Sequence, residues 1–287
     1  MALKDLLVYA DQNEGARFRL RLAADLASRH KSRLTVLFVR EFNQAQRDLR
    51  KKAELGLVSG EDLDRLDQHI QSSIDEAADR LRSTVQALGS EHHLEVEWRC
   101  VDGPAWVSAP QHARYADLCI LGSSKVDDGA SIGSALSRKL LFVTGRPVVF
   151  VPSFGSLETL GRHIMVGWNE SHAATRAVSD ALPLIERAER TTVITIDSAD
   201  FVDRNGTRAA DKLVQHLRRH NPSVGAVNLK EVRARSIADA LQGEARTLGA
   251  DLIVTGAYGH SKLWEDLVGG VTRDLLIRMN FPLFMSH

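Results

Sequence analysis

The feature that most constrains the fold of this chain is an internal repeat. An apolar run that ends in a polar residue opens each half, at residues 6–11 and again at residues 164–169. Near the end of each half, residues 116–122 spell Ala-Asp-Leu-Cys-Ile-Leu-Gly and residues 250–256 spell Ala-Asp-Leu-Ile-Val-Thr-Gly. Self-similarity of this kind indicates two copies of one structural unit joined in tandem.

Within each half, apolar runs of strand length alternate with segments of helical periodicity. After the first run, Ala16, Leu20 and Ala23 fall on one face of a helix, and a proline, Pro147 or Pro282, precedes the last short run. Strands without clean polar–apolar alternation, separated by helices, are typical of parallel sheets covered on both faces. Each half is therefore predicted to be an α/β unit, a doubly wound five-stranded parallel sheet with strand order 3-2-1-4-5.

The third strand of each half is expected at residues 94–100 and 227–232, where alternation is clearer and a position near a sheet edge is indicated. The first unit is predicted to span residues 1–153 and the second residues 163–287. Residues 154–162 form the predicted linker, which follows a proline and contains two glycines.

The first half carries a polar stretch, residues 41–60, before a long helix. The apolar residues of that helix recur on one face: Leu63, Leu66, Ile70, Ile74, Ala77, Leu81, Val85 and Leu88. This periodicity predicts a core-facing helix preceded by a surface insertion. A lid over a ligand, or an arm that contacts a partner, is the alternative.

Charge and hydropathy limit the classes of partner. Lys and Arg total 37 and so do Asp and Glu, so the chain lacks the net positive charge typical of general nucleic-acid binders. The N-terminal apolar run is too short for a signal peptide and is broken by Asp11, and no run approaches the roughly 20 apolar residues of a membrane span. We expect a soluble cytoplasmic protein with neither nucleic acid nor membrane as a partner.

The two cysteines, Cys100 and Cys119, lie in apolar runs predicted as strands. Both are expected to be buried, unreactive thiols. Their spacing indicates neither a disulfide framework nor a zinc site, and no metal ligands are predicted.

In a doubly wound sheet, ligands bind beyond the carboxyl ends of the strands, where the strand order reverses. The order 3-2-1-4-5 places that point between the first and fourth strands of each half. Asp11 and the loop after Gly122 flank it in the first half, and Asn169 and the loop after Gly256 flank it in the second. These residues are the predicted binding site.

The second-half loop is rich in glycine and ends in a hydroxyl residue. Its candidate residues are Gly256, Gly259, Gly269, Gly270 and Thr272. Glycines allow backbone amides to approach a phosphate, and a helix that begins near Gly270 would direct free N–H groups at an anion. His260 in this loop is a further candidate phosphate contact. The alternatives are a simple strand–loop–helix turn and a solvated loop histidine.

This loop resembles the ATP-binding motif of universal stress proteins, which has Gly, two residues, Gly, nine residues, Gly, and then Ser or Thr. The second half matches up to the last position, where Gly270 replaces the hydroxyl residue. Asn169 stands where nucleotide-binding members usually have Asp. The first half instead keeps Asp11 and a Gly133-Ser134 pair.

Ser137 follows that pair, but the first half departs from the motif elsewhere. Lys125 replaces its second loop glycine, and its spacer is two residues shorter. The resemblance covers nearly the whole chain and identifies it as similar to tandem universal stress proteins. It implies a Rossmann-like fold of the adenine nucleotide alpha hydrolase type.

The resemblance also implies that ATP or AMP is bound as a regulatory ligand, with the second half as the better site. Loss of the final hydroxyl removes a hydrogen bond worth about 0.5–1.5 kcal/mol. Asn169 in place of Asp removes a negative charge, which either weakens Mg²⁺-assisted binding or relieves repulsion, so the role of Mg²⁺ stays open.

No catalytic residues are predicted. The chain contains no HxGH, SGGxDS, GxxxxGK[ST] or GxGxxG pattern. We expect a binding protein that is not an enzyme. The alternatives are a scaffold whose two pockets have degenerated and a slow ATPase.

The last strand of each half, at residues 148–151 and 283–285, is apolar and is expected at a sheet edge. Such an edge exposes unpaired backbone groups. In the family that the chain resembles, the last strand is the usual pairing element. We therefore expect the two terminal strands to pair within one chain as an internal pseudo-dimer, with a homodimer and an unidentified protein partner as further possibilities.

Overall fold

The computed structural model describes residues 2–13, 15–41, 50–57, 60–122, 135–153, 157–196, 209–229, 236–257 and 270–287. The strands of the first half are β1 (Asp5–Ala10), β2 (Arg33–Arg40), β3 (Val96–Asp102), β4 (Leu118–Gly122) and β5 (Val148–Val151). Those of the second half are β6 (His163–Gly167), β7 (Arg190–Ile196), β8 (Val224–Leu229), β9 (Leu252–Gly256) and β10 (Leu283–Ser286).

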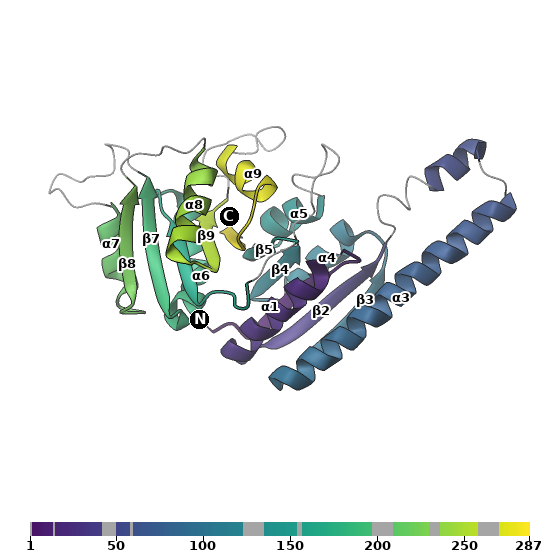
Figure 1. Ribbon diagram of the computed structural model, residues 1–287, viewed down its shortest axis with the longest axis horizontal. Helices are drawn as coiled ribbons and strands as arrows, with labels where there is room; N and C mark the ends of the chain where they lie inside the picture. Colours follow the sequence, from purple (N-terminus) through teal and green to yellow (C-terminus); the bar gives the residue numbers. More distant parts are fainter. Residues whose placement is uncertain are drawn as a thin grey trace.

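Helices separate the strands in both halves (Figure 1). Those of the first half are α1 (Gly15–His30), α3 (Gly60–His92), α4 (Ala105–Ala113) and α5 (Ala135–Val143), with a short helical segment, η1 (Ala53–Leu57), before α3. Those of the second half are α6 (His172–Arg187), α7 (Ala209–Leu217), α8 (Ile237–Leu248) and α9 (Gly270–Ile277).

The described strands form one ten-stranded sheet in the order β3-β2-β1-β4-β5-β10-β9-β6-β7-β8. Neighbours within each half are parallel, and the predicted order 3-2-1-4-5 is confirmed in both. β5 and β10 pair antiparallel, with Phe150 opposite Leu283 and Val148 opposite Met285. The predicted pairing of the two terminal strands within the chain is therefore confirmed.

Both faces of the sheet are buried, which explains the nearly continuous apolar runs. Val8 and Phe38 belong to a core that includes residues of α1, α3, α6 and α7. Leu7 and Leu37 belong to a second core that includes residues of α4, α5, α8 and α9. Full burial of one such side chain contributes about 1.5–3 kcal/mol, so the two cores hold the helices against the sheet.

The repeated Ala-Asp pair before the fourth strand of each half has a structural role. Asp251 accepts hydrogen bonds from the backbone N–H groups of Gly161, Arg162 and His163, each at 3.0 Å, and from the Thr159 hydroxyl at 2.7 Å. These bonds fasten the entry of β6 to the entry of β9.

Asp117 does the same in the first half with fewer partners. Its carboxylate accepts from the backbone N–H groups of Lys4 at 2.7 Å and Asp5 at 3.0 Å, which fastens β1 to β4. Both carboxylates lie at the amino ends of the strands, opposite the ends where ligands are expected.

The third strands lie slightly away from their predicted positions. β3 begins and ends later than the predicted residues 94–100. β8 begins earlier than the predicted residue 227, and the predicted residues 230–232 lie outside the described residues. As outer strands of the sheet they have one pairing partner each, so alternation alone defines their ends poorly.

The prediction that both cysteines are buried is wrong for Cys100, which is exposed on β3. This outer strand is only partly covered. Cys119 is buried on β4, and burial raises the pKa of its thiol to about 12.

Helix α3 confirms the predicted core-facing helix over much of its length. Ile70, Ile74, Leu81 and Val85 are buried in the core shared with α1. The amino-terminal part of α3 projects beyond the sheet together with η1 (Figure 1). Whether this projection acts as a lid or a partner arm stays a prediction.

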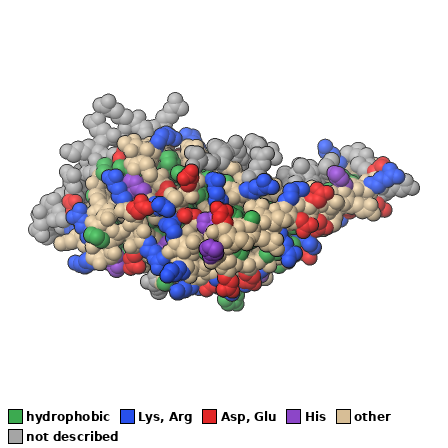
Figure 2. All heavy atoms as spheres, turned by 60° about the horizontal axis from the view of Figure 1, so that its bottom comes forward, with side chains coloured by type: hydrophobic (Ala, Val, Ile, Leu, Met, Phe, Trp, Pro, Cys, Tyr) green, Lys and Arg blue, Asp and Glu red, His purple; other side chains and the backbone are tan. Residues whose placement is uncertain are grey.

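The surface is mixed in charge where it is visible. Figure 2 shows Lys and Arg side chains interspersed with Asp and Glu over one face and along the projecting part of α3. Among the described helices, none combines the length and apolar character needed to cross a membrane.

The two halves also meet at the carboxyl end of α1. The Arg29 guanidinium donates to the Leu160 carbonyl, and the Arg187 guanidinium of α6 donates to the Arg29 carbonyl. His30 is buried beside them. Burial and the nearby Arg187 and Arg29 charges lower the pKa of His30 to about 4.

We predict that Asp251→Ala lowers the free energy of unfolding by about 3 kcal/mol or more, because four donors, one buried and three partly buried, lose their buried acceptor. Asp117→Ala is the matched control in the other half. It is expected to lower the free energy of unfolding by less, about 1–2 kcal/mol, because the Asp117 carboxylate accepts the two hydrogen bonds described above. Urea unfolding measures both. Equal losses would contradict the structural role assigned to Asp251.

We also predict that stability falls between about pH 6.5 and 4 because of His30. The folded state keeps His30 neutral until about pH 4, whereas the unfolded chain protonates it near pH 6.5, so acid favours the unfolded state. The loss is on the order of 3 kcal/mol. Urea unfolding across this range should give a shallower pH dependence for His30→Gln, and identical slopes for both proteins would disprove the assignment.

Candidate functional site

In the first half, a buried arginine lies where the predicted crevice should be. β1 and β4 are neighbours, and Asp11 and Gly122 lie at their carboxyl ends as predicted. Arg19 of α1 is 2% exposed, and its Nε donates to the Tyr9 carbonyl at 2.8 Å. Its Nη2 lies 3.0 Å from Oδ1 of Asp11, as an ion pair rather than an aligned hydrogen bond.

The Arg19 guanidinium lies directly over Gly122. A methyl group added at Gly122 would be 1.8 Å from Nη1 of Arg19. Glycine is therefore needed here to admit the protein's own side chain. The sequence signal for Arg19 was its place on the apolar face of α1, between Ala16 and Ala23, where a charged residue is unexpected.

Tyr9 and Glu41 fill the neighbouring space, beyond β1 and β2. The Glu41 carboxylate accepts from the Ala105 backbone N–H at the start of α4, at 2.9 Å, and lies 3.5 Å from the Tyr9 hydroxyl. Burial, followed by the Glu41 charge, raises the pKa of Tyr9. Protein side chains thus satisfy much of the polar surface of the first-half crevice.

In the second half, the corresponding turn uses the same local chemistry. Oδ1 of Asn169 accepts from the Ser171 backbone N–H at 3.2 Å, as Oδ1 of Asp11 accepts from the Asn13 N–H at 3.1 Å. The Ser171 hydroxyl accepts from the Ala174 N–H at 3.1 Å and caps α6. In the structure, the side chains of Asn169 and Asp11 therefore each stabilise a turn.

The second crevice differs from the first in what lies over its glycine. Ala177 follows Asn169 at the spacing at which Arg19 follows Asp11, and it is fully buried. A methyl group added at Gly256 would be 2.4 Å from backbone atoms of Ala173 and Ala174. Helix α6 therefore lies directly on β9, and no guanidinium separates the two.

The helix that follows the glycine loop is described from Gly270 onward, and the residues just before it lie outside the described ranges. Thr272 lies in its first turn and is 6% exposed. Ser137 of α5 occupies the equivalent place in the first half, since each precedes a Leu-Leu pair at the same spacing. The remaining predicted site residues lie outside the described residues: Gly133, Ser134, Gly259, His260 and Gly269.

Within the described ranges, no three His, Cys, Asp or Glu side chains are grouped so that they could hold a metal ion. The polar groups described at the two crevices are instead backbone amides, hydroxyls, the Asn169 side chain, the Glu41 carboxylate and the Arg19–Asp11 ion pair. Groups of this kind bind and orient a ligand.

Solved structures share this arrangement along the whole chain. A universal stress protein from Archaeoglobus fulgidus DSM 4304 matches 98% of this chain and 97% of its own, with a TM-score of 0.67 and 14% identity. A functionally unknown protein from Pseudomonas aeruginosa PAO1 matches 99% of this chain and 92% of its own, with a TM-score of 0.54 and 16% identity.

A further structure, from Pseudomonas aeruginosa UCBPP-PA14, matches 99% of this chain and 93% of its own, with a TM-score of 0.53 and 17% identity. No family model and no curated protein sequence matches the chain. The similarity establishes the fold, which is the tandem α/β fold seen in the universal stress protein of Archaeoglobus fulgidus.

We predict that Gly256→Ala destabilises the protein by about 3 kcal/mol or more, because the new methyl group meets helix backbone that cannot move alone. Gly122→Ala should cost less, because the atoms it meets belong to the end of the Arg19 side chain. Thermal and urea unfolding compare the two variants. A larger loss for Gly122→Ala would contradict the packing described at Gly256.

Proposed function

We propose that the protein is a cytoplasmic stress-response protein that binds one adenine nucleotide, ATP or AMP, in the crevice of its second half. The nucleotide acts as a regulatory ligand, and the response passes through a conformational change or a partner protein. The fold supports this proposal because it resembles that of a universal stress protein. The predicted glycine loop supports it for the second half.

The second half is chosen as the nucleotide site because a different residue faces the fourth strand in each half. In the first half, Arg19 occupies the crevice, and its charge is held by Asp11. A nucleotide there would have to displace this ion pair, whose Arg19 side is buried. Leaving a buried charge without its partner costs about 3–5 kcal/mol. In the second half, Ala177 brings no competing charge.

The helix after the glycine loop also favours the second half. Gly270 begins α9, so the first N–H groups of the helix lie at the end of the predicted phosphate loop. Thr272 adds a hydroxyl in that first turn. We propose that these groups bind the phosphates, with Gly256, Gly259, Gly269 and Asn169 around them.

We predict one bound nucleotide per chain and a tenfold or so weaker affinity for Thr272→Val, since a hydrogen bond to a charged phosphate is worth about 1.5–3 kcal/mol. Valine matches the shape of threonine and removes the hydroxyl. Ser137→Ala is the matched control in the first half and should leave the affinity unchanged. Isothermal titration calorimetry with ATP and with AMP, each with and without Mg²⁺, measures these values.

Two results would overturn the proposal. Failure of the folded wild-type chain to bind ATP or AMP saturably would favour a scaffold with degenerated pockets. Weaker binding in Ser137→Ala with no change in Thr272→Val would place the nucleotide in the first half.

A further inference from the structure

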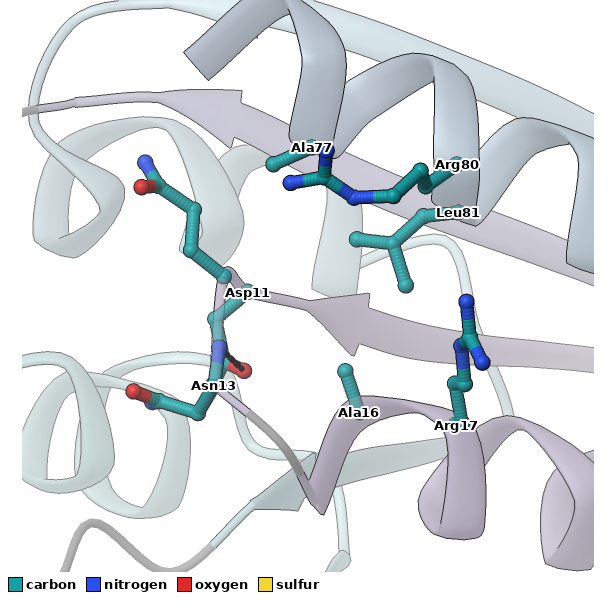
Figure 3. A pocket seen from close by; sticks show the side chains of 8 residues that line it. Asp11, Asn13, Ala16, Arg17, Ala77, Arg80 and Leu81 are labelled. Carbon is teal, nitrogen blue, oxygen red and sulfur yellow. Dashed lines mark hydrogen bonds between the residues drawn. The ribbon is translucent and has the colours of Figure 1, made fainter. Parts of the chain in front are cut away.

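A cavity lies in the first half, between the β1–α1 turn and helix α3. Its volume is about 310 Å³, near the lower end of the range of roughly 300–1,000 Å³ that is typical of ligand pockets. Its lining residues are Asp11, Gln12, Asn13, Ala16, Arg17, Ala77, Arg80 and Leu81 (Figure 3).

Two arginines from different helices line this pocket. Arg17 comes from the first turn of α1 and Arg80 from the middle of α3, and Figure 3 shows them on two sides of the same space. The Arg80 guanidinium has a neighbour in Glu76 at 3.4 Å, but both side chains are more than half exposed. An exposed pair of this kind holds its charges weakly, so Arg80 is free to meet a ligand.

The position of Arg17 is unfavourable for its own helix. The amino end of a helix carries a partial positive charge, so a cation in the first turn costs roughly 0.3–1 kcal/mol. The first turn of α1 contains no acidic residue to offset it. A bound anion would relieve this repulsion and would gain from both Arg17 and the helix end.

Among the described lining residues, the one carboxylate does not cancel these charges. Asp11 is paired with the buried Arg19 guanidinium at 3.0 Å. The pocket therefore presents two arginines beside an already compensated aspartate. Two guanidinium groups suit a phosphate group, whose oxygens accept paired hydrogen bonds.

The rest of the lining suits an organic body attached to that phosphate. Ala16, Ala77 and Leu81 are buried side chains that form an apolar wall. Asn13 and Gln12 supply amide groups at the turn, and Nε2 of Gln12 also donates to the Glu41 carbonyl at 3.3 Å. The pocket thus combines a cationic side, an apolar side and a polar end.

We propose that this pocket binds a compact organic phosphate, at a site separate from the nucleotide crevice of the second half. Arg17 and Arg80 hold the phosphate, and the wall formed by Ala16, Ala77 and Leu81 contacts the carbon skeleton. The site belongs to the first half alone by sequence, because Thr175 takes the place of Arg17 in α6. The long α3, which supplies Arg80, gives the first half a ligand of its own.

We predict saturable binding of ribose 5-phosphate to the full-length protein at constant ionic strength, and weaker binding of inorganic phosphate. Arg17→Gln and Arg80→Gln should each weaken the affinity for ribose 5-phosphate by roughly tenfold or more, because each removes a charge-assisted hydrogen bond. Isothermal titration calorimetry measures the affinities, and thermal unfolding verifies that each variant is folded.

Arg82→Gln is the matched control, because Arg82 is an exposed arginine of α3 that lines a different groove. It should leave the affinity unchanged, and so should Thr272→Val in the second half. Equal weakening by all three arginine variants would show general charge attraction and overturn the site. Equal affinity for ribose 5-phosphate and inorganic phosphate would overturn the role of the apolar wall, and absence of saturable binding would overturn the whole proposal.

Discussion

The arrangement of each half depends on one carboxylate that ties its first strand to its fourth. Asp117 and Asp251 accept backbone hydrogen bonds from the entries of β1 and β6. The first and fourth strands are parallel and are not consecutive in the chain, so no tight turn sets their register. The hydrogen bonds of the carboxylate align the amino ends of the two strands instead. Once those entries are aligned, the carboxyl ends of the same strands bring Asp11 near Gly122 and Asn169 near Gly256.

From that common frame, one side chain makes the two crevices different. Arg19 brings a guanidinium between α1 and β4, and Asp11 and the Tyr9 carbonyl compensate it. Ala177 lets α6 lie directly on β9. A buried ion pair contributes little net stability but is costly to break, so it fixes the local structure of the first half more than it stabilises it. This difference leaves the second crevice as the better candidate for a nucleotide and Asp11 as part of the first half's own framework.

The sequence predicted the fold well because the signals for it are repeated and periodic. Two copies of the same apolar pattern indicated two doubly wound units, whose expected strand order is observed. The apolar final strands, together with the family resemblance, indicated the pairing of β5 with β10. The bounds of β3, the start of β8 and the exposure of Cys100 were missed because outer strands are covered on fewer sides. The strand order alone was enough to place four residues at the crevices: Asp11, Gly122, Asn169 and Gly256.

The detailed chemistry of the site was harder to predict. A glycine at the end of a strand can allow either a phosphate or a packed helix to approach closely. Only the structure shows that Gly122 accommodates the Arg19 side chain and that Gly256 accommodates α6. Arg19 was hidden in a helix whose other buried residues are mostly alanine and leucine. The α1–α3 pocket joins residues more than sixty positions apart in the sequence, so no local motif could have indicated it.

The antiparallel pairing of β5 with β10 is short, but the two strands that pair belong to one polypeptide. Two separate subunits would need enough concentration, and matching surfaces on every copy, to form the same pairing. Tethering replaces that encounter with an intramolecular one, whose effective concentration for a short linker is on the order of millimolar. Each half of the sheet can then acquire its own residues at its ligand face, because association no longer requires the two faces to be identical.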